Sequence, residues 1–346
     1  METVWFLLIA LMVAGYAVMD GYDLGVGILS PLIARNEAEQ AALRATIGHV
    51  WGANEVWLIA LGGLLFLAFP RAYAASFSGF YLAFMILLWC LIGRGLALEV
   101  RSRLDDAVWR TACDILFPLA SFLVALALGT AAGNVIRGVP LDAQGRMFLP
   151  LWTNLSLGGG PAIFDWYTLV VGFSAVAIFS LHGANYLVAK TDGSMQQRAR
   201  QLAAWAWWPA AVLVVLSLAA APGVNPALLK NYAAHPAAFL VVGLPLAALA
   251  ATFLLRRGER EAAAFMASAV LIIGLVASAA LGLYPDLLPA RSNPGRSLTV
   301  HNAAADPYGL GVALVWFGIG LCLMALYIVF THRLFGGKVR PGDDRY

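Results

Sequence analysis

Charged residues are scarce in this sequence. Asp, Glu, Lys and Arg make up 12% of its 346 residues, whereas apolar residues make up 61%. Soluble domains carry roughly a quarter charged residues, so the composition excludes an ordinary soluble protein. The net charge of +3 does not suggest a nucleic-acid partner, because the basic residues lie between apolar segments and do not cluster. The sequence therefore predicts a protein whose solvent is membrane lipid.

Cysteines and cofactor-binding motifs are also scarce. Cys90, Cys113 and Cys322 lie in or beside apolar segments, without Cys-x-x-Cys spacing. We expect them to be small buried hydrophobic residues, not disulfides or metal ligands. The sequence has no Walker loop, dinucleotide-binding glycine pattern or zinc-binding His/Glu motif. Chemistry with soluble cofactors and a metal site are therefore not expected in this chain.

Long apolar stretches are abundant. A helix needs about 20 mostly apolar residues to cross the ~30 Å hydrocarbon core. Nine such stretches predict an all-α, polytopic membrane protein with helices at 4–33, 55–69, 73–98, 113–135, 165–189, 203–221, 237–255, 261–283 and 308–331. The second is short, so a tilted or partial crossing stays open. The longest connection, 137–161, is too short for a core of its own, so we expect residues 1–346 to form one integral membrane domain.

The positive charges predict the orientation. With nine crossings, sixteen of the 22 Lys and Arg residues fall on the side of the C-terminus and six on the other. The positive-inside rule then places the C-terminus in the cytoplasm and the N-terminus outside.

A weak internal repeat accompanies this pattern. Asp-Gly-Tyr-Asp at 20–23 and His-Gly-Ala-Asn at 182–185 both place polar residues three apart around a glycine. This similarity suggests two related four-helix units, 1–136 and 164–284, with a peripheral last helix at 308–332.

Two acids lie near the middle of the first predicted helix. Ionisable groups inside a membrane span cost at least ~2.5–3.5 kcal/mol each, so they usually face protein or water and often carry function. Helical spacing puts Asp20 and Asp23 on one face with Tyr16 and Gly27. The carboxyl groups are either protonated and hydrogen bonded, or ionised and paired, and a proton path uses both states. The alternative is that they only hold the helix against a neighbour.

Other polar residues lie near the next helices. Trp51, Asn54 and Glu55 stand at i, i+3 and i+4, where Glu55 is either an intramembrane acid or a first-turn acid at the positive end of a helix dipole. Arg94 lies deep in its helix, so we expect it to have an acidic partner. Arg101 lies near the membrane boundary, where a snorkelling side chain is the simplest interpretation.

His182 is the only histidine at a depth suited to haem. A second axial ligand at matching depth is not evident in the sequence. A hydrogen-bonded structural role is therefore the preferred interpretation.

Three motifs together resemble one family. They are Asp-Gly-Tyr-Asp-Leu-Gly-Val-Gly at 20–27, Trp-Gly-Ala-Asn-Glu-Val-Trp-Leu at 51–58 and Ser-Phe-Ser-Gly-Phe-Tyr at 76–81. This pattern resembles subunit II of the cytochrome bd-type quinol oxidases. The similarity continues, in order, through Arg94, 101–102, 133–134, 138–140, 182–187 and 293–299, so it spans nearly the whole chain.

The resemblance implies a haem-free subunit that stabilises a haem-bearing subunit I. That partner oxidises quinol and reduces oxygen to water in the respiratory chain of the bacterial cytoplasmic (inner) membrane. The haems then belong to the partner, and no cofactor is expected in this chain, although the sequence leaves open a structurally bound quinone. The chain is not expected to be catalytic alone. Besides subunit I and lipid, a small single-helix accessory subunit is compatible with the resemblance.

The resemblance also marks residues of a proton path from the cytoplasm to the oxygen site. Asp23 and Glu99 match acidic positions of that path, and Glu99 stands where an aspartate is also found. Some members have an acid directly after the first tryptophan of the second motif, where this chain has Gly52. Glycine at this position also occurs among cyanide-insensitive variants of the family. Glu55 is therefore an alternative member of the path, whereas Asp20 is expected to hold the helix in place.

Two other functions stay open at this point. A secondary transporter would use Asp20, Asp23 and Arg94 to bind a substrate and its coupling ion, and broken helices around a polar pocket would favour it. A purely structural anchor would use every acid only for packing. Unchanged oxidase turnover after replacement of the acids would favour the anchor.

Overall fold

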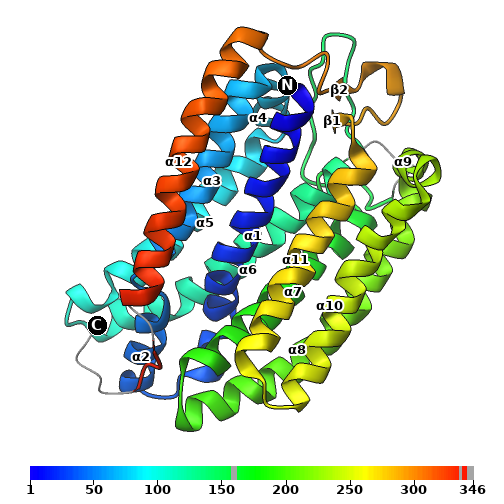
Figure 1. Cartoon of the computed structure of the whole chain (residues 1–346). Helices are drawn as coiled ribbons and strands as arrows, with labels where there is room; N and C mark the ends of the chain where they lie inside the picture. Colours follow the sequence, from blue (N-terminus) through cyan, green and yellow to red (C-terminus); the bar gives the residue numbers. More distant parts are fainter. Residues whose placement is uncertain (157–161, 335–336, 341–346) are drawn as a thin grey trace.

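Nine long helices dominate the computed structural model, which describes residues 1–156, 162–334 and 337–340 (Figure 1). Within these residues, nine helices are long and apolar enough to cross a membrane. They are α1 (Glu2–Ile33), α3 (Trp51–Ala68), α5 (Tyr81–Glu99), α6 (Ala107–Arg137), α7 (Trp166–Lys190), α8 (Gly193–Val224), α10 (Phe239–Arg257), α11 (Glu261–Leu283) and α12 (Pro307–Leu334). The all-α class and the predicted number of spans are confirmed.

Shorter elements connect the spans. The helices are α2 (Glu37–Ile47), α4 (Pro70–Gly79) and α9 (Leu229–Ala234), with the 3-10 helices η1 (Arg101–Arg103), η2 (Pro226–Leu228), η3 (Pro236–Ala238) and η4 (Pro294–Arg296). Strands β1 (Asp286–Leu288) and β2 (Leu298–Thr299) pair antiparallel, and the sequence analysis did not predict this sheet. In Figure 1, α4, the sheet and the N-terminus lie at the upper end of the bundle, and α2 lies at the lower end.

Several predicted helix bounds are wrong, for identifiable reasons. The helix predicted at 73–98 is two helices, because the chain breaks at Phe80 between α4 and α5. Pro70 stands in the first turn of α4, where its missing N–H costs nothing. The helix predicted from 203 begins at Gly193, since its first turns are polar and an apolar run does not reveal them.

The amphipathic helix α2 was also missed. The Asn36 side chain accepts a hydrogen bond from the Glu39 backbone N–H at 2.9 Å, as an N-cap does. Leu43 and Ile47 are fully buried in the core at this end of the bundle. The cap residue followed by acidic residues was the available signal.

A second apolar cluster lies at the upper end, where the 138–151 segment packs on helix ends. Val139, Leu141 and Met147 are buried there with Leu288 and Val300 from the region of the sheet. The buried apolar residues of this segment thus share a core with the helix ends, and the single membrane domain stays a prediction.

Helix α1 is central to the bundle and contacts α3, α6, α7 and α11. It meets α7 where Gly25 and Gly183 bring the two backbones together. Helix α7 in turn contacts α8 and α11, and the pairs α5–α6 and α10–α11 also pack together. The third and fourth spans of each proposed unit thus pack together, α5 on α6 and α10 on α11, as two related four-helix units would. The repeat itself stays a prediction. Among the described side chains of α12, Leu310 and Thr331 near its two ends are buried, and the most apolar window of the helix has no buried residue, as expected for a peripheral helix.

The orientation predicts opposite signals from two reporter fusions. A fusion near Gly158, which lies outside the described residues, should be active only as a periplasmic reporter. A fusion near Ser194, at the start of α8, should be active only as a cytoplasmic reporter, because sixteen of the 22 basic residues lie on that side. Alkaline phosphatase and fluorescent-protein activities at each site measure this. One compartment for both sites would contradict the orientation.

Candidate functional site

A buried ion pair joins α1 to α5. Asp20, Asp23 and Arg94 are all 0% exposed. Arg94 donates to both carboxylate oxygens of Asp20, at 3.0 Å from Nη1 and 2.5 Å from Nη2. The Tyr16 hydroxyl donates to Asp20 Oδ2 at 2.9 Å. Asp20 is thus the acidic partner that was predicted for Arg94, and the two residues fix α1 against α5.

Asp23 has fewer partners than Asp20. Its Oδ2 accepts a hydrogen bond from Asn54 Nδ2 of α3 at 2.8 Å and lies 4.0 Å from Arg94 Nη2. Asn54 Nδ2 also approaches the Tyr22 hydroxyl at 2.7 Å. Asp23 Oδ1 is buried and has no hydrogen-bond partner among the described residues. One guanidinium thus faces two carboxyl groups, and it donates both hydrogen bonds to Asp20, whereas Asp23 lies at the longer distance.

Glu55 lies one helical turn beyond Trp51 on α3. It is half-buried and interacts electrostatically with Arg94 and Asp20. Helix α3 begins at Trp51, four residues before Glu55, and it has no acid in its first turn. The alternative that Glu55 stabilises the positive end of the helix dipole is therefore wrong. The side chain of Asn54 faces α1 and is polar. A prediction based on apolar residues therefore placed the start of this helix at residue 55, whereas α3 begins at Trp51.

Glu99 and Trp51 form the edge of the cluster. Glu99 ends α5 and is exposed, and its Oε1 accepts a hydrogen bond from Trp51 Nε1 at 2.9 Å. The Trp51 ring packs over Gly95, where a Cβ would lie 3.2 Å from it. Gly52 is exposed, and a Cβ at this position would meet nothing within 4 Å, so the chain itself leaves room for a side chain there.

Arg101 belongs to a separate network at the same end of the bundle. It is buried, and it donates to Asp114 at 2.6 and 2.7 Å and to Glu37 at 3.0 and 3.1 Å. The prediction that the Arg101 side chain snorkels to the membrane boundary is therefore wrong. These hydrogen bonds hold the pKa of Glu37 below its ordinary value. Sequence reasoning missed Glu37 and Asp114, although the N-cap at Asn36 pointed to structure in this segment.

His182 lies apart from the acidic cluster, between α1 and α11. Its Nδ1 is 2.7 Å from Ser268 Oγ, and its Nε2 is 3.1 Å from the Val18 carbonyl oxygen. The ring also stacks on Phe265. Both ring nitrogens are thus engaged in hydrogen bonds, an arrangement that fits the structural role.

A second buried ion pair, also missed by sequence reasoning, lies toward the opposite end of the bundle. Arg137 at the end of α6 pairs with Asp165, the N-cap of α7, and donates to Asn134 Oδ1 at 2.6 Å. Asp165 and Thr168 form a capping box. These groups satisfy one another, so we assign them to the packing of α6 on α7. Among the described residues no three His, Cys, Asp or Glu side chains are placed to hold a metal ion.

The transporter hypothesis has little support in this geometry. It requires interrupted helices around a polar pocket, whereas α1 runs unbroken through Asp20 and Asp23, and α5 through Arg94.

Comparison with known proteins agrees with the resemblance. Residues 1–335 match the family described as cytochrome bd terminal oxidase subunit II. The chain is 28% identical to cytochrome bd-I ubiquinol oxidase subunit 2 of Escherichia coli K12, over 98% of this chain and 95% of the relative. It is 29% identical to cytochrome bd ubiquinol oxidase subunit 2 of Bacillus subtilis, over 96% and 97%.

The fold is also that of a solved structure. The bd oxidase of Geobacillus thermodenitrificans contains a chain that superposes with a TM-score of 0.76 at 19% identity, covering 97% of this chain and 99% of that one. Because the family match covers almost the whole sequence, the chain belongs to the cytochrome bd terminal oxidase subunit II family.

Proposed function

We propose that this chain is the haem-free subunit II of a quinol:oxygen oxidoreductase, in which it stabilises a haem-bearing subunit I and supplies buried acids to a proton path. The relatives named as subunits of ubiquinol oxidases support the reaction. The observation that carries the path is Asp23, a fully buried carboxyl group where α1, α3 and α5 meet, with one oxygen that has no hydrogen-bond partner in the described part of the chain.

The order of groups along the path follows from the helices. Glu99 is exposed at the end of the bundle that we propose faces the cytoplasm, and Trp51 fixes its carboxylate. Five residues, or about 7.5 Å of helix rise, separate Glu99 from Arg94 on α5. A proton that enters at Glu99 crosses this depth through water to Asp23, whose position Asn54 fixes. Trp51 and Asn54 are positioning residues, since neither titrates in the physiological range.

The surface beside this path supports a protein partner. Glu55 is a half-buried acid within a helix of which only 11% of the spanning residues are buried in this chain. An acid facing lipid is costly, so we propose that subunit I covers the α3 face. A covered Glu55 then lies between the Asp23 region and the partner, where it can pass a proton on.

Replacing Asp23 with Asn tests the path. The amide keeps the shape and a hydrogen bond but cannot carry the proton, so the complex should assemble while turnover per haem falls on the order of tenfold. Haem content and quinol-driven oxygen consumption measure the two effects. Asp105→Asn is the matched control, because this carboxylate is 96% exposed. Asp20→Asn should instead reduce assembly, since it weakens the Arg94 pair. An assembled Asp23→Asn complex that turns over at the unmodified rate would exclude Asp23 from the path.

A further inference from the structure

A groove between α8 and α10 is not part of the proposed proton path. It has a volume of about 450 Å³ and lies at the end of the bundle that carries most of the basic residues. Its lining consists of Arg200, Ala204, Trp205, Trp208, Phe253, Arg256, Arg257 and Glu259. Aromatic and cationic side chains thus meet in one concave surface.

The aromatic wall lies at membrane-interface depth. Trp205 and Trp208 stand where the polar first turns of α8 give way to its apolar part, and they are 74% and 62% exposed. Tryptophan at this depth typically lies among lipid headgroups and glycerol groups. Phe253, one turn before the end of α10, faces the same groove.

The cationic wall contains an unsatisfied donor. The Arg257 guanidinium stacks on Phe253 at 4.3 Å from the ring centroid, and that of Arg256 lies 5.7 Å from it. Arg256 Nη1 is buried and has no hydrogen-bond partner among the described residues. Buried donors are normally bonded, so this one requires an acceptor that the described residues do not supply.

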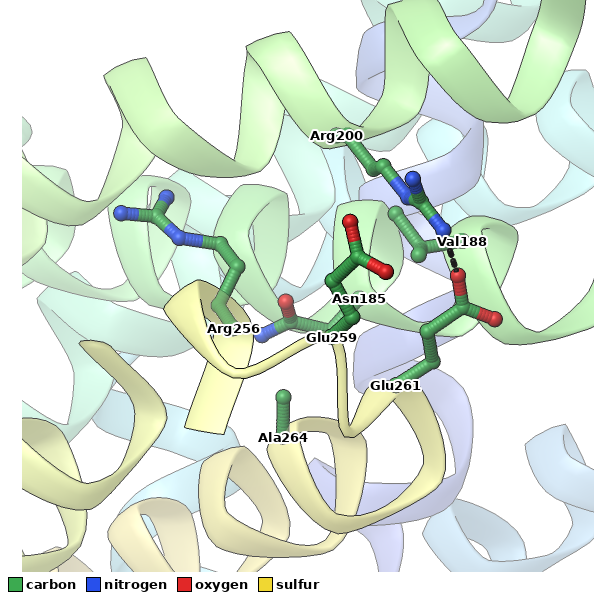
Figure 2. A pocket seen from close by; sticks show the side chains of 7 residues that line it. All are labelled: Asn185, Val188, Arg200, Arg256, Glu259, Glu261 and Ala264. Atoms are coloured by element: carbon green, nitrogen blue, oxygen red, sulfur yellow. Dashed lines mark hydrogen bonds and ion pairs between the residues drawn. The ribbon is translucent and has the colours of Figure 1, made fainter. Parts of the chain in front are cut away.

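Not all of the charge in the groove is available. Figure 2 shows a smaller neighbouring cavity that shares Arg200, Arg256 and Glu259 with the groove. In this view Arg200 is bonded to Glu261 on one side of Glu259, and the guanidinium of Arg256 lies on the other. With Arg200 neutralised by Glu261, Arg256 and Arg257 exceed Glu259 by one positive charge. The groove therefore suits a ligand with one net negative charge.

We propose that this groove binds an anionic phospholipid of the phosphatidylglycerol type. Its phosphate oxygens accept hydrogen bonds from Arg256 and Arg257, and its glycerol and upper acyl groups pack on Trp205, Trp208 and Phe253. The carboxylate of Glu259 accepts from a headgroup hydroxyl, which distinguishes this lipid from a bare phosphate. Basic pockets between membrane helices on the cytoplasmic side are typical sites for such headgroups.

Native mass spectrometry of the purified oxidase complex, titrated with phosphatidylglycerol, tests the site. Each arginine near an anionic headgroup contributes about fivefold in affinity, so Arg256→Gln/Arg257→Gln should weaken binding roughly twentyfold or more. Arg260→Gln is the matched control, an exposed arginine at the same end that does not line the groove. Trp208→Ala should also weaken binding, and it leaves the charges intact. Haem content and turnover, measured in parallel, verify that each variant assembles and report separately on the proposed oxidase function.

Three results would overturn the proposal. Equal losses of phosphatidylglycerol affinity in the Arg256/Arg257 variant and in Arg260→Gln would indicate that the lipid is attracted by the surface charge in general and not by the groove. Phosphatidylcholine or phosphatidylethanolamine with matched chains binding as tightly would exclude anionic selectivity. Inorganic phosphate displacing the lipid at millimolar concentration, with no effect of Trp208→Ala, would indicate a site for free phosphate instead.

Discussion

Arg94→Gln should strongly reduce accumulation of the assembled complex. The guanidinium is fully buried and donates to both oxygens of Asp20, and the neutral amide cannot replace its charge. Breaking a buried ion pair by removing one partner costs about 3–5 kcal/mol. Because total stabilities are only about 5–15 kcal/mol, the amount of chain in the membrane should fall at least tenfold. Immunoblots of membranes and haem content of the purified complex measure this.

The same prediction has a control and a compensating variant. Arg103 is exposed, two residues beyond the partnered Arg101, and Arg103→Gln should accumulate normally. Asp20→Asn combined with Arg94→Gln removes both charges of the pair and should recover part of the loss, because the uncompensated charge causes most of the cost. Normal levels of Arg94→Gln alone would mean that Asp20 is held by Tyr16 and other groups, and that the ion pair is dispensable.

The Arg94–Asp20 ion pair was only partly predictable from the sequence. The cost of a charge in lipid predicted that Arg94 has an acidic partner. It did not select Asp20 over Asp23 or Glu55, since the partners lie 74 positions apart and the choice depends on how α5 packs beside α1. The partners of Arg101, on α2 and α6, were missed for the same reason.

Helix number was predictable where helix ends were not. Crossing the membrane requires apolar length, which the sequence displays directly. The ends depend on caps and on polar side chains that face other helices. Trp51 and Asn54 lie in α3 although no apolar run includes them, because Asn54 bonds to Asp23 across the contact with α1. The break at Phe80 follows Ser78 and Gly79, a turn signal that a search for long apolar stretches does not register.

Gly25→Ala should disrupt the contact between α1 and α7. A Cβ at Gly25 would overlap the carbonyl oxygen of Phe179 and lie 2.9 Å from the Cα of Gly183. A Cβ at Gly183 would likewise lie 2.6 Å from the Cα of Gly25. These neighbours are backbone atoms, which cannot rotate away as a side chain does, so the added methyl must separate the helices. Overpacking of this kind costs about 1–3 kcal/mol and sometimes more.

The damage should extend to function, because α1 carries Asp20 and Asp23 within two turns of Gly25. We expect a thermal midpoint of the purified complex lowered by several degrees, reduced haem content, and slower turnover in the complex that remains. Gly243→Ala on α10, away from the proposed α3 interface, is the matched control, since a Cβ there meets nothing within 4 Å and alanine in a helix interior is favoured by roughly 0.5–1 kcal/mol. If Gly25→Ala is as stable as Gly243→Ala, the two backbones are not in contact, and the side-chain interactions of Asp20 and Asp23 are enough to hold the acids of α1 in place.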